Sequence, residues 1–163
     1  MTAYTATERR SHLLAAVSHG GSYDVINLTS TVEIAVATTV DRTIDFGRIP
    51  SNARILSMSR LYWDDLATSG SPTLDLGLAA VDGNLANADD PNALLDAGTL
   101  SSAGSDVIAL EDIANAGLPA WDFVESETSD PGGDLMVYGT LVDAPINKPG
   151  GGTMTLDLYY VVD

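Results

Sequence analysis

The 163-residue sequence contains no cysteine, a single lysine and only two phenylalanines. Without cysteine the chain cannot form disulfides, thiolate metal sites or a cysteine nucleophile. No run of about 18 apolar residues occurs, so we expect no membrane span. Residues 1–10 are polar, which differs from the apolar core of a secretory signal, so we expect no export by that route.

Positive charge is also scarce. Seven Lys and Arg against 23 Asp and Glu give a formal net charge of −16. Because nucleic-acid binding depends on clustered cations, we expect no nucleic-acid partner. Such a surface repels its own copies, and salt limits the range of that repulsion to about 8 Å at physiological strength. The acidity fits a saline habitat and equally fits simple solubility.

Alternation of apolar and polar residues is the main structural signal. Apolar residues make up 45% of the chain, enough for one substantial core. They recur with the period of two that is typical of half-buried strands. The expected inward side chains in residues 31–40, 73–78 and 154–162 are Val32, Ile34, Val36, Val40, Leu74, Leu76, Leu78, Met154, Leu156, Leu158, Tyr160 and Val162. Turn-forming stretches separate these runs. The sequence predicts a mainly β fold, an antiparallel β-sandwich or jelly-roll-like single domain over residues 23–163.

Two stretches depart from this pattern. Residues 1–22 hold one short apolar cluster at 13–17, so we predict an extended N-terminal arm that orders only against a partner. Residues 87–120 are predicted as a long loop with a short helix, capped by Ser105 and ended by Gly117 before Pro119.

Residues 53–65 are apolar on both alternating sides. One set comprises Ile55, Leu61 and Trp63, and the other comprises Leu56, Met58 and Tyr62. One side would pack on the core of the domain and the other on a neighbouring subunit, although an ordinary two-sided core strand shows the same pattern.

Residues suited to catalysis are few. The only histidines, His12 and His19, lie in the arm, where no rigid scaffold is expected to hold a catalytic base. No phosphate-binding loop, dinucleotide fingerprint or paired-histidine zinc motif occurs. We therefore expect a protein that is not an enzyme and has no cofactor.

Carboxylates leave two alternatives open. Asp64 and Asp65 follow a predicted strand and could form an acid–base pair. A loop with Asp82, Asn84, Asp89 and Asp90 could hold a structural calcium ion, but it lacks the regular calcium-loop spacing, so a solvated acidic loop is favoured.

Four arginines recur every six residues: Arg42, Arg48, Arg54 and Arg60. This even spacing would place them on one side of a straight extended chain, which the turn at Pro50 interrupts. Their forked side chains suit carboxylates of a neighbouring copy. Local pairing, for instance of Arg42 with Asp41 or Asp45, is weighted equally.

Several stretches carry a resemblance to a known family. They are residues 44–58, with Ala53-Arg54-Ile55 after a proline turn, residues 71–78, with Thr73-Leu74-Asp75, residues 129–134, and the Tyr159-Tyr160-Val161 ending of residues 152–163. Over roughly residues 40–163 the chain resembles small virion structural proteins of tailed double-stranded DNA bacteriophages, the capsid decoration or cement proteins.

The resemblance implies a protein on the outer surface of the capsid. It would bind the major capsid protein, stabilise contacts between its subunits, and form a homo-oligomer, most simply a trimer at local threefold axes. We expect the subunit or capsid interface to include Arg9, Arg10, Leu13, Leu14, Arg54, Arg60 and Tyr62.

Two other classes remain open. A head-fibre, tail or carbohydrate-binding receptor module would need an exposed aromatic platform, for which the candidates are Trp63, Trp121, Tyr159 and Tyr160. A glycan hydrolase would rest on the carboxylates alone.

Overall fold

We analysed a computed structural model of the whole chain. It describes residues 4–5, 7–13, 24–36, 38–81, 89–107, 117–123, 129–130 and 132–162, with the backbone alone at 4–5, 7–13, 89, 105–107 and 123.

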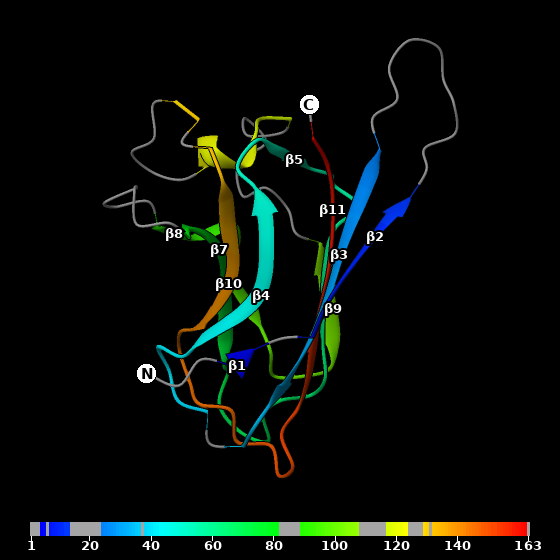
Figure 1. Cartoon of the computed structure of the whole chain (residues 1–163). Coiled ribbons are helices and arrows are strands. Elements are labelled where there is room, and N and C mark those ends of the chain that lie inside the picture. The colour runs from blue at the N-terminus through cyan, green and yellow to red at the C-terminus, as the bar shows by residue number, and fades with distance from the viewer. Residues whose placement is uncertain are drawn as a thin grey trace.

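Two β-sheets face each other across one apolar core (Figure 1). The first sheet has five strands in the order β1, β4, β10, β7, β8, with bounds Tyr4–Thr5, Thr43–Pro50, Asp134–Leu141, Thr73–Ala80 and Asp89–Thr99. The second has six, in the order β2, β3, β11, β6, β9 with β5 also beside β11; their bounds are Thr7–Leu13, Val25–Ile34, Gly152–Val162, Arg60–Trp63, Gly104–Val107 and Ala53–Ile55. All pairings among these strands are antiparallel except that of β1 with β4. The predicted β-sandwich is confirmed.

The alternating pattern decides which side chains fill the core. Leu74, Leu76 and Leu78 of β7 are fully buried, and so are Met154, Leu156 and Leu158 of β11. Since alternate residues point to opposite faces, these strands each present one apolar row to the space between the sheets. The inward face predicted for β7 and for β11 is confirmed, with Tyr160 buried and Val162 packed against the core.

The strand predicted at residues 31–40 lies elsewhere. β3 spans Val25–Ile34, so Val32 and Ile34 are buried as expected. Val36 and Val40 are instead 50% and 37% exposed. The prediction was wrong for those two valines because the chain leaves the sheet after Ile34 and the alternation continues into a connection between the sheets.

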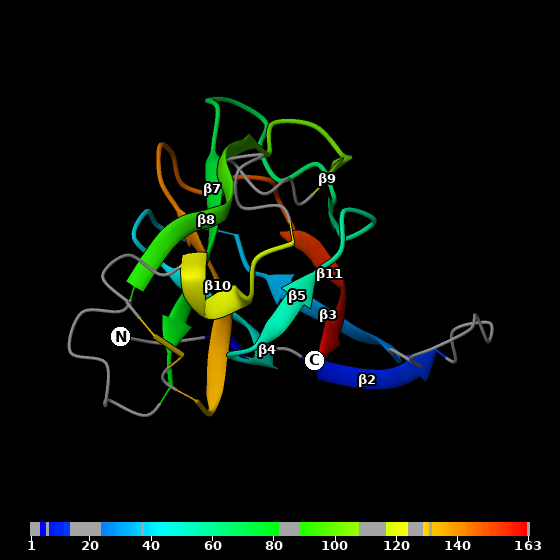
Figure 2. The same ribbon diagram turned by 90° about the horizontal axis from the view of Figure 1, so that it is seen from above.

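Part of the predicted arm is paired with the body of the protein. β1 lies beside β4 in the first sheet, and β2 lies beside β3 at the edge of the second sheet, where it leans away from the sandwich (Figures 1 and 2). Residues 4–5 and 7–13 therefore have backbone partners within the chain. The rest of residues 1–22 lies outside the described residues.

The predicted loop at residues 87–120 is largely wrong, since β8 and β9 occupy much of it. Ser105 lies in β9, so it does not cap a helix. Residues 108–116, where that helix would continue, are not among the described ones. A short 3₁₀ helix, η2, does occur nearby at Ala120–Phe123. Strands were missed here because irregular pairing of β8 with β7 removes the period of two from the sequence.

Candidate protein–protein interface

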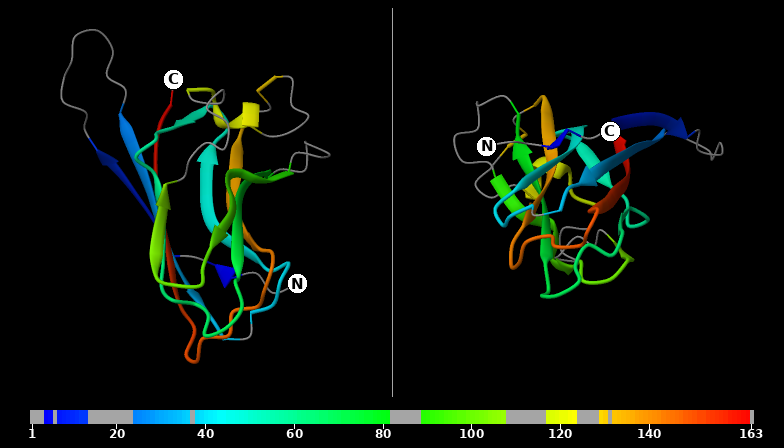
Figure 3. Two further views of the ribbon diagram at one scale, coloured as in Figure 1. Left: turned by 180° about the vertical axis from the view of Figure 1, so that it is seen from behind. Right: turned by 90° about the horizontal axis from the view of Figure 1, so that it is seen from below.

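One face of the second sheet is left open by the described elements, whereas its other face packs on the core (Figures 2 and 3). We call it the outer face. Its residues come from the three adjacent strands β3, β11 and β6 and from the residue that follows β6. They are Thr29, Thr31 and Glu33 of β3, Thr153, Thr155, Asp157 and Tyr159 of β11, Arg60 and Tyr62 of β6, and Asp64. They alternate with the buried core residues of the same strands.

A break between β5 and β6 sets the orientation of Arg60 and Tyr62. The chain turns at residues 56–59, opposite Tyr159 of β11. There the buried Ser59 hydroxyl accepts a hydrogen bond from the Tyr159 amide (2.9 Å) and donates to the Tyr159 carbonyl (3.2 Å). The side chain thus gives the Tyr159 amide the partner that the interrupted ladder lacks, while the Tyr159 carbonyl also accepts from the Leu56 amide.

The two apolar sides of residues 53–65 have different environments in the structure. Ile55 and Leu61 are buried in the core, whereas Met58 is 58% and Tyr62 40% exposed. The first half of the prediction is confirmed. A neighbouring subunit on the second side stays a prediction.

The outer face is ordered in three rows that run across the strands. Register places Asp157 between Arg60 and Thr29, and Thr155 between Tyr62 and Thr31. Glu33 lies beside Thr153. Polar contacts within the rows fix the side chains: the Thr31 and Thr155 hydroxyl oxygens lie 2.9 Å apart, and Thr29 donates to Asp157 over 2.7 Å.

The third row ends in acidic groups. The amide and hydroxyl of Thr153 both donate to the Asp64 carboxylate over 2.8 Å. These bonds hold the pKa of Asp64 below its ordinary value, because they stabilise the ionised form. Glu33 at the other side of the row is exposed. The face is therefore acidic at its Thr153 end and carries Arg60 toward the other.

Charge is divided unequally between the sheets. The strands of the first sheet carry six carboxylates against Arg48 alone, namely Asp45, Asp75, Asp89, Asp90, Asp96 and Asp134. Those of the second carry four of each sign: Glu8, Glu33, Asp106 and Asp157 against Arg9, Arg10, Arg54 and Arg60. In a chain with a formal charge of −16, the second sheet is formally neutral.

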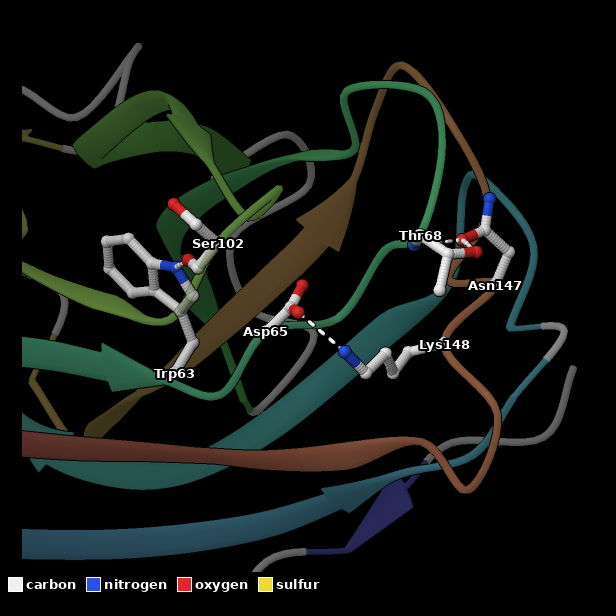
Figure 4. A network of polar contacts seen from close by, with 6 residues as sticks. All are labelled: Trp63, Asp65, Thr68, Ser102, Asn147 and Lys148. Carbon is white, nitrogen blue, oxygen red and sulfur yellow. Dashed lines mark hydrogen bonds and ion pairs between the residues drawn. The ribbon is translucent and has the colours of Figure 1, made fainter.

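A polar network closes the connections at one end of the sandwich (Figure 4). Lys148 pairs with Asp65 over 2.6 Å, which lowers the pKa of Asp65 through the hydrogen bond first and the lysine charge second. Asn147 accepts from the Thr68 amide over 2.7 Å, and the Trp63 indole donates to the Ser102 carbonyl over 2.8 Å. The first two contacts join the β6–β7 and β10–β11 connections, and the third joins β6 to the β8–β9 connection.

The carboxylates considered for chemistry have other partners in the structure. Asp64 binds Thr153 and Asp65 binds Lys148. Among the residues whose side chains are described, no group of three acidic or imidazole residues is placed to hold a metal ion. The possible calcium loop at Asp82 and Asn84 lies outside the described residues, as does the side chain of Asp89.

The first sheet contains a carboxylate, Asp75, whose environment disfavours its ionised form. Asp75 of β7 is partly buried, and it accepts the Ala97 amide over 2.9 Å. Burial raises the pKa of Asp75, and the negative charges of Asp96 and Asp143 add to the rise. An ionised Asp75 therefore opposes folding.

The predicted interface residues are only partly brought together. Arg60 and Tyr62 lie on the outer face, whereas Arg54 belongs to β5 and donates to the carbonyl of Gly117. In β2, Arg9, Arg10 and Leu13 are in register with Thr29, Leu28 and Val25 of β3, and Leu14 lies outside the described residues. Whether any of the seven contacts a partner stays a prediction.

The six-residue arginine spacing does not produce one row. Arg42 precedes β4 and Arg48 lies within it, in the first sheet, while Arg54 and Arg60 lie in the second. Sequence reasoning also missed Glu33, Thr29 and Asp157, because only strand pairing shows that they share a face with Arg60.

The four aromatic residues considered as an exposed platform do not form one together. Tyr160 is only 2% exposed, and Trp63 and Trp121 are partly buried against the core. Tyr159 lies on the outer face, opposite in direction to Tyr160. Of the histidines, His12 lies in β2 and His19 outside the described residues. No helix within the described part of the chain is long and apolar enough to cross a bilayer.

Comparison with known proteins finds shared architecture only. No protein-family model matches the chain, and no curated protein sequence matches it significantly. A chain in the capsid of Ralstonia phage GP4 shares the fold with a TM-score of 0.56 and 22% identity, over 93% of this chain and 91% of that one. A chain in the capsid asymmetric unit of cyanophage Pam1 gives a TM-score of 0.59 and 19% identity, over 93% and 94% respectively.

Proposed function

We propose that this protein is a structural component of a bacteriophage virion, located in the capsid. The carrying observation is the shared fold with one chain from each of two phage capsids, over at least 91% of all the chains compared. Nearly complete coverage in both directions means that the compared chains are of similar length and that the likeness extends over nearly all of each one.

Within the capsid we propose the role of a decoration or cement protein on the outer surface. It binds the major capsid protein, stabilises contacts between its subunits, and works as a homo-oligomer without catalysing a reaction. A formal charge of −16 supports a position away from packaged DNA. Many copies on a closed lattice multiply modest contact energies through avidity.

The test is to strip the protein from purified particles and follow their survival on heating and on osmotic shock. We expect stripped particles to lose their DNA at lower temperature, and purified protein added back to restore survival. Unchanged survival after complete removal would contradict cementing. Antibody labelling of intact particles tests the outer position: label on the tail or on head fibres would favour the fibre or receptor-binding alternative.

A further inference from the structure

We propose that the outer face of the second sheet pairs with the same face of a second copy, with the strands of the two copies crossing, through contacts of Arg60 with Glu33. The inference concerns the purified chain and is independent of the capsid role. Copies that each carry a formal charge of −16 repel one another. The strands of the second sheet, unlike those of the first, have no net formal charge, so they oppose association less.

Arg60 and Glu33 are the exposed, opposite charges that remain available on this face. Both side chains are exposed, and neither forms an ion pair or hydrogen bond with another side chain in the described part of the structure. Asp157 and Asp64, the other carboxylates of the face, already accept bonds from Thr29 and Thr153.

The two charges cannot meet within one chain. They flank β11 on opposite sides, with Arg60 beside Asp157 and Glu33 beside Thr153. Four residues along a strand and two strand spacings separate backbone positions by about 16 Å. Opposite charges at opposite corners of a face make that face complementary to itself.

A twofold axis through the centre of the face satisfies both corners. Midway between Arg60 and Glu33 lies Thr155 of β11. An axis that lies in the plane of the face at this point, perpendicular to the line from Arg60 to Glu33, brings Arg60 of each copy over Glu33 of the other, so that the pair forms twice. It also places Tyr62, which is 40% exposed and in register with Thr155, next to the axis. Tyr and Arg are the residues enriched at the centres of protein interfaces.

The size of the face suits a weak, specific contact. Three strands, of which β11 is the longest with 11 residues, give a flat area of at most about 540 Å², below the roughly 800 Å² per partner of a standard interface. The dimer should therefore depend on protein concentration, with further gain where copies are held close together.

Charge-reversal variants test the contact by sedimentation equilibrium over a range of concentrations. Glu33→Arg and Arg60→Glu should each weaken dimerisation about tenfold or more, since the pair occurs twice. The double variant should restore it. Glu33→Arg is the sharper single change because it lowers the overall negative charge and yet should weaken association. Arg48→Glu in the first sheet is the control, with the same net charge as Arg60→Glu, and should leave dimerisation within about twofold.

Several experimental outcomes would contradict the proposed dimer. A wild-type chain that remains monomeric at every concentration overturns the proposal, and so does a double variant no better than the single ones. Circular dichroism confirms folding of each variant. As a second measurement, Thr155→Cys should cross-link to dimers with a short bismaleimide, because the natural chain has no cysteine; the control Thr99→Cys on β8 should not. Equal cross-linking of both variants would contradict the assigned face.

Discussion

The two sheets share one core but have different surfaces. In the first, β7 is buried on almost all positions, because the irregular strand β8 curls over it and Pro91 lies against Gly77. In the second, β11 is buried on one side and open on the other. The strands of the first sheet have an excess of negative charge, and those of the second are formally neutral. One sheet is thus specialised for its own packing, while the other offers a regular polar face.

The largest loss of folding stability is expected from a side chain added at Gly77 in the first sheet. A Cβ built there would lie 2.0 Å from the Asp90 carbonyl oxygen and 2.4 Å from the Pro91 carbonyl carbon. Since both obstacles are backbone atoms, Gly77→Val should cost at least about 4 kcal/mol or prevent folding. Urea denaturation measures the loss. Gly132→Ala is the control: its φ of 72° is strained for alanine but nothing lies within 4 Å, so about 1 kcal/mol is expected.

The next effect tests whether the sheets contribute equally to the core. Leu76 of β7 and Leu156 of β11 are both 0% exposed. Replacement by alanine should cost about 3 kcal/mol in either case, from lost burial and the cavity left behind. Chemical denaturation of both variants gives the two free energies of unfolding. A difference above about 2 kcal/mol would show that one sheet dominates the core.

A smaller loss is expected at the break in the second sheet. Ser59→Ala removes the hydroxyl that bonds both the amide and the carbonyl of Tyr159. The carbonyl keeps its hydrogen bond from the Leu56 amide, but leaving the Tyr159 amide unpaired should cost about 1–3 kcal/mol, and it should loosen the orientation of Arg60. Amide exchange at Tyr159 is the direct measurement. Protection as strong as in the natural chain would show that Ser59 is dispensable to the ladder. Ser57→Ala, at an exposed position of the same turn, is the control.

The smallest expected change in stability comes from removing a single carboxylate charge in each sheet. Burial and the neighbouring charges of Asp96 and Asp143 raise the pKa of Asp75, so its ionised form opposes folding at neutral pH. Asp75→Asn should add about 0.5 kcal/mol at pH 7, because its amide oxygen can still accept from Ala97. The gain should vanish as the pH falls below the ordinary aspartate pKa, where the natural residue is protonated in both states.

Asp157→Asn in the neutral sheet is the matched variant. Asp157 accepts from Thr29, so removing its charge should bring no gain at pH 7. Thermal unfolding of both variants from pH 3 to 8 checks the contrast. Equal stabilisation by both changes would mean that net charge alone matters, and that the difference between the sheets has no energetic basis.

Regular strands were predictable and irregular ones were not. β7 and β11 follow strict alternation, so Leu76 and Leu156 could be assigned to the core from the sequence. β8 shifts register twice against β7, which erases the alternation, and residues 89–99 therefore resembled a loop. Val36 and Val40 continue an apolar pattern after the strand has ended, which local periodicity cannot detect.

By itself the sequence determined the class of the protein: mainly β, strongly acidic, without cysteine, and with Arg60 and Tyr62 in a stretch of alternating residues. Only the tertiary structure decided which strands become neighbours, and so placed Glu33, Thr155 and Arg60 on one open face. The physical reason is that alternation is a local property of each strand, whereas register and strand order depend on the free energy of packing residues distant in the chain.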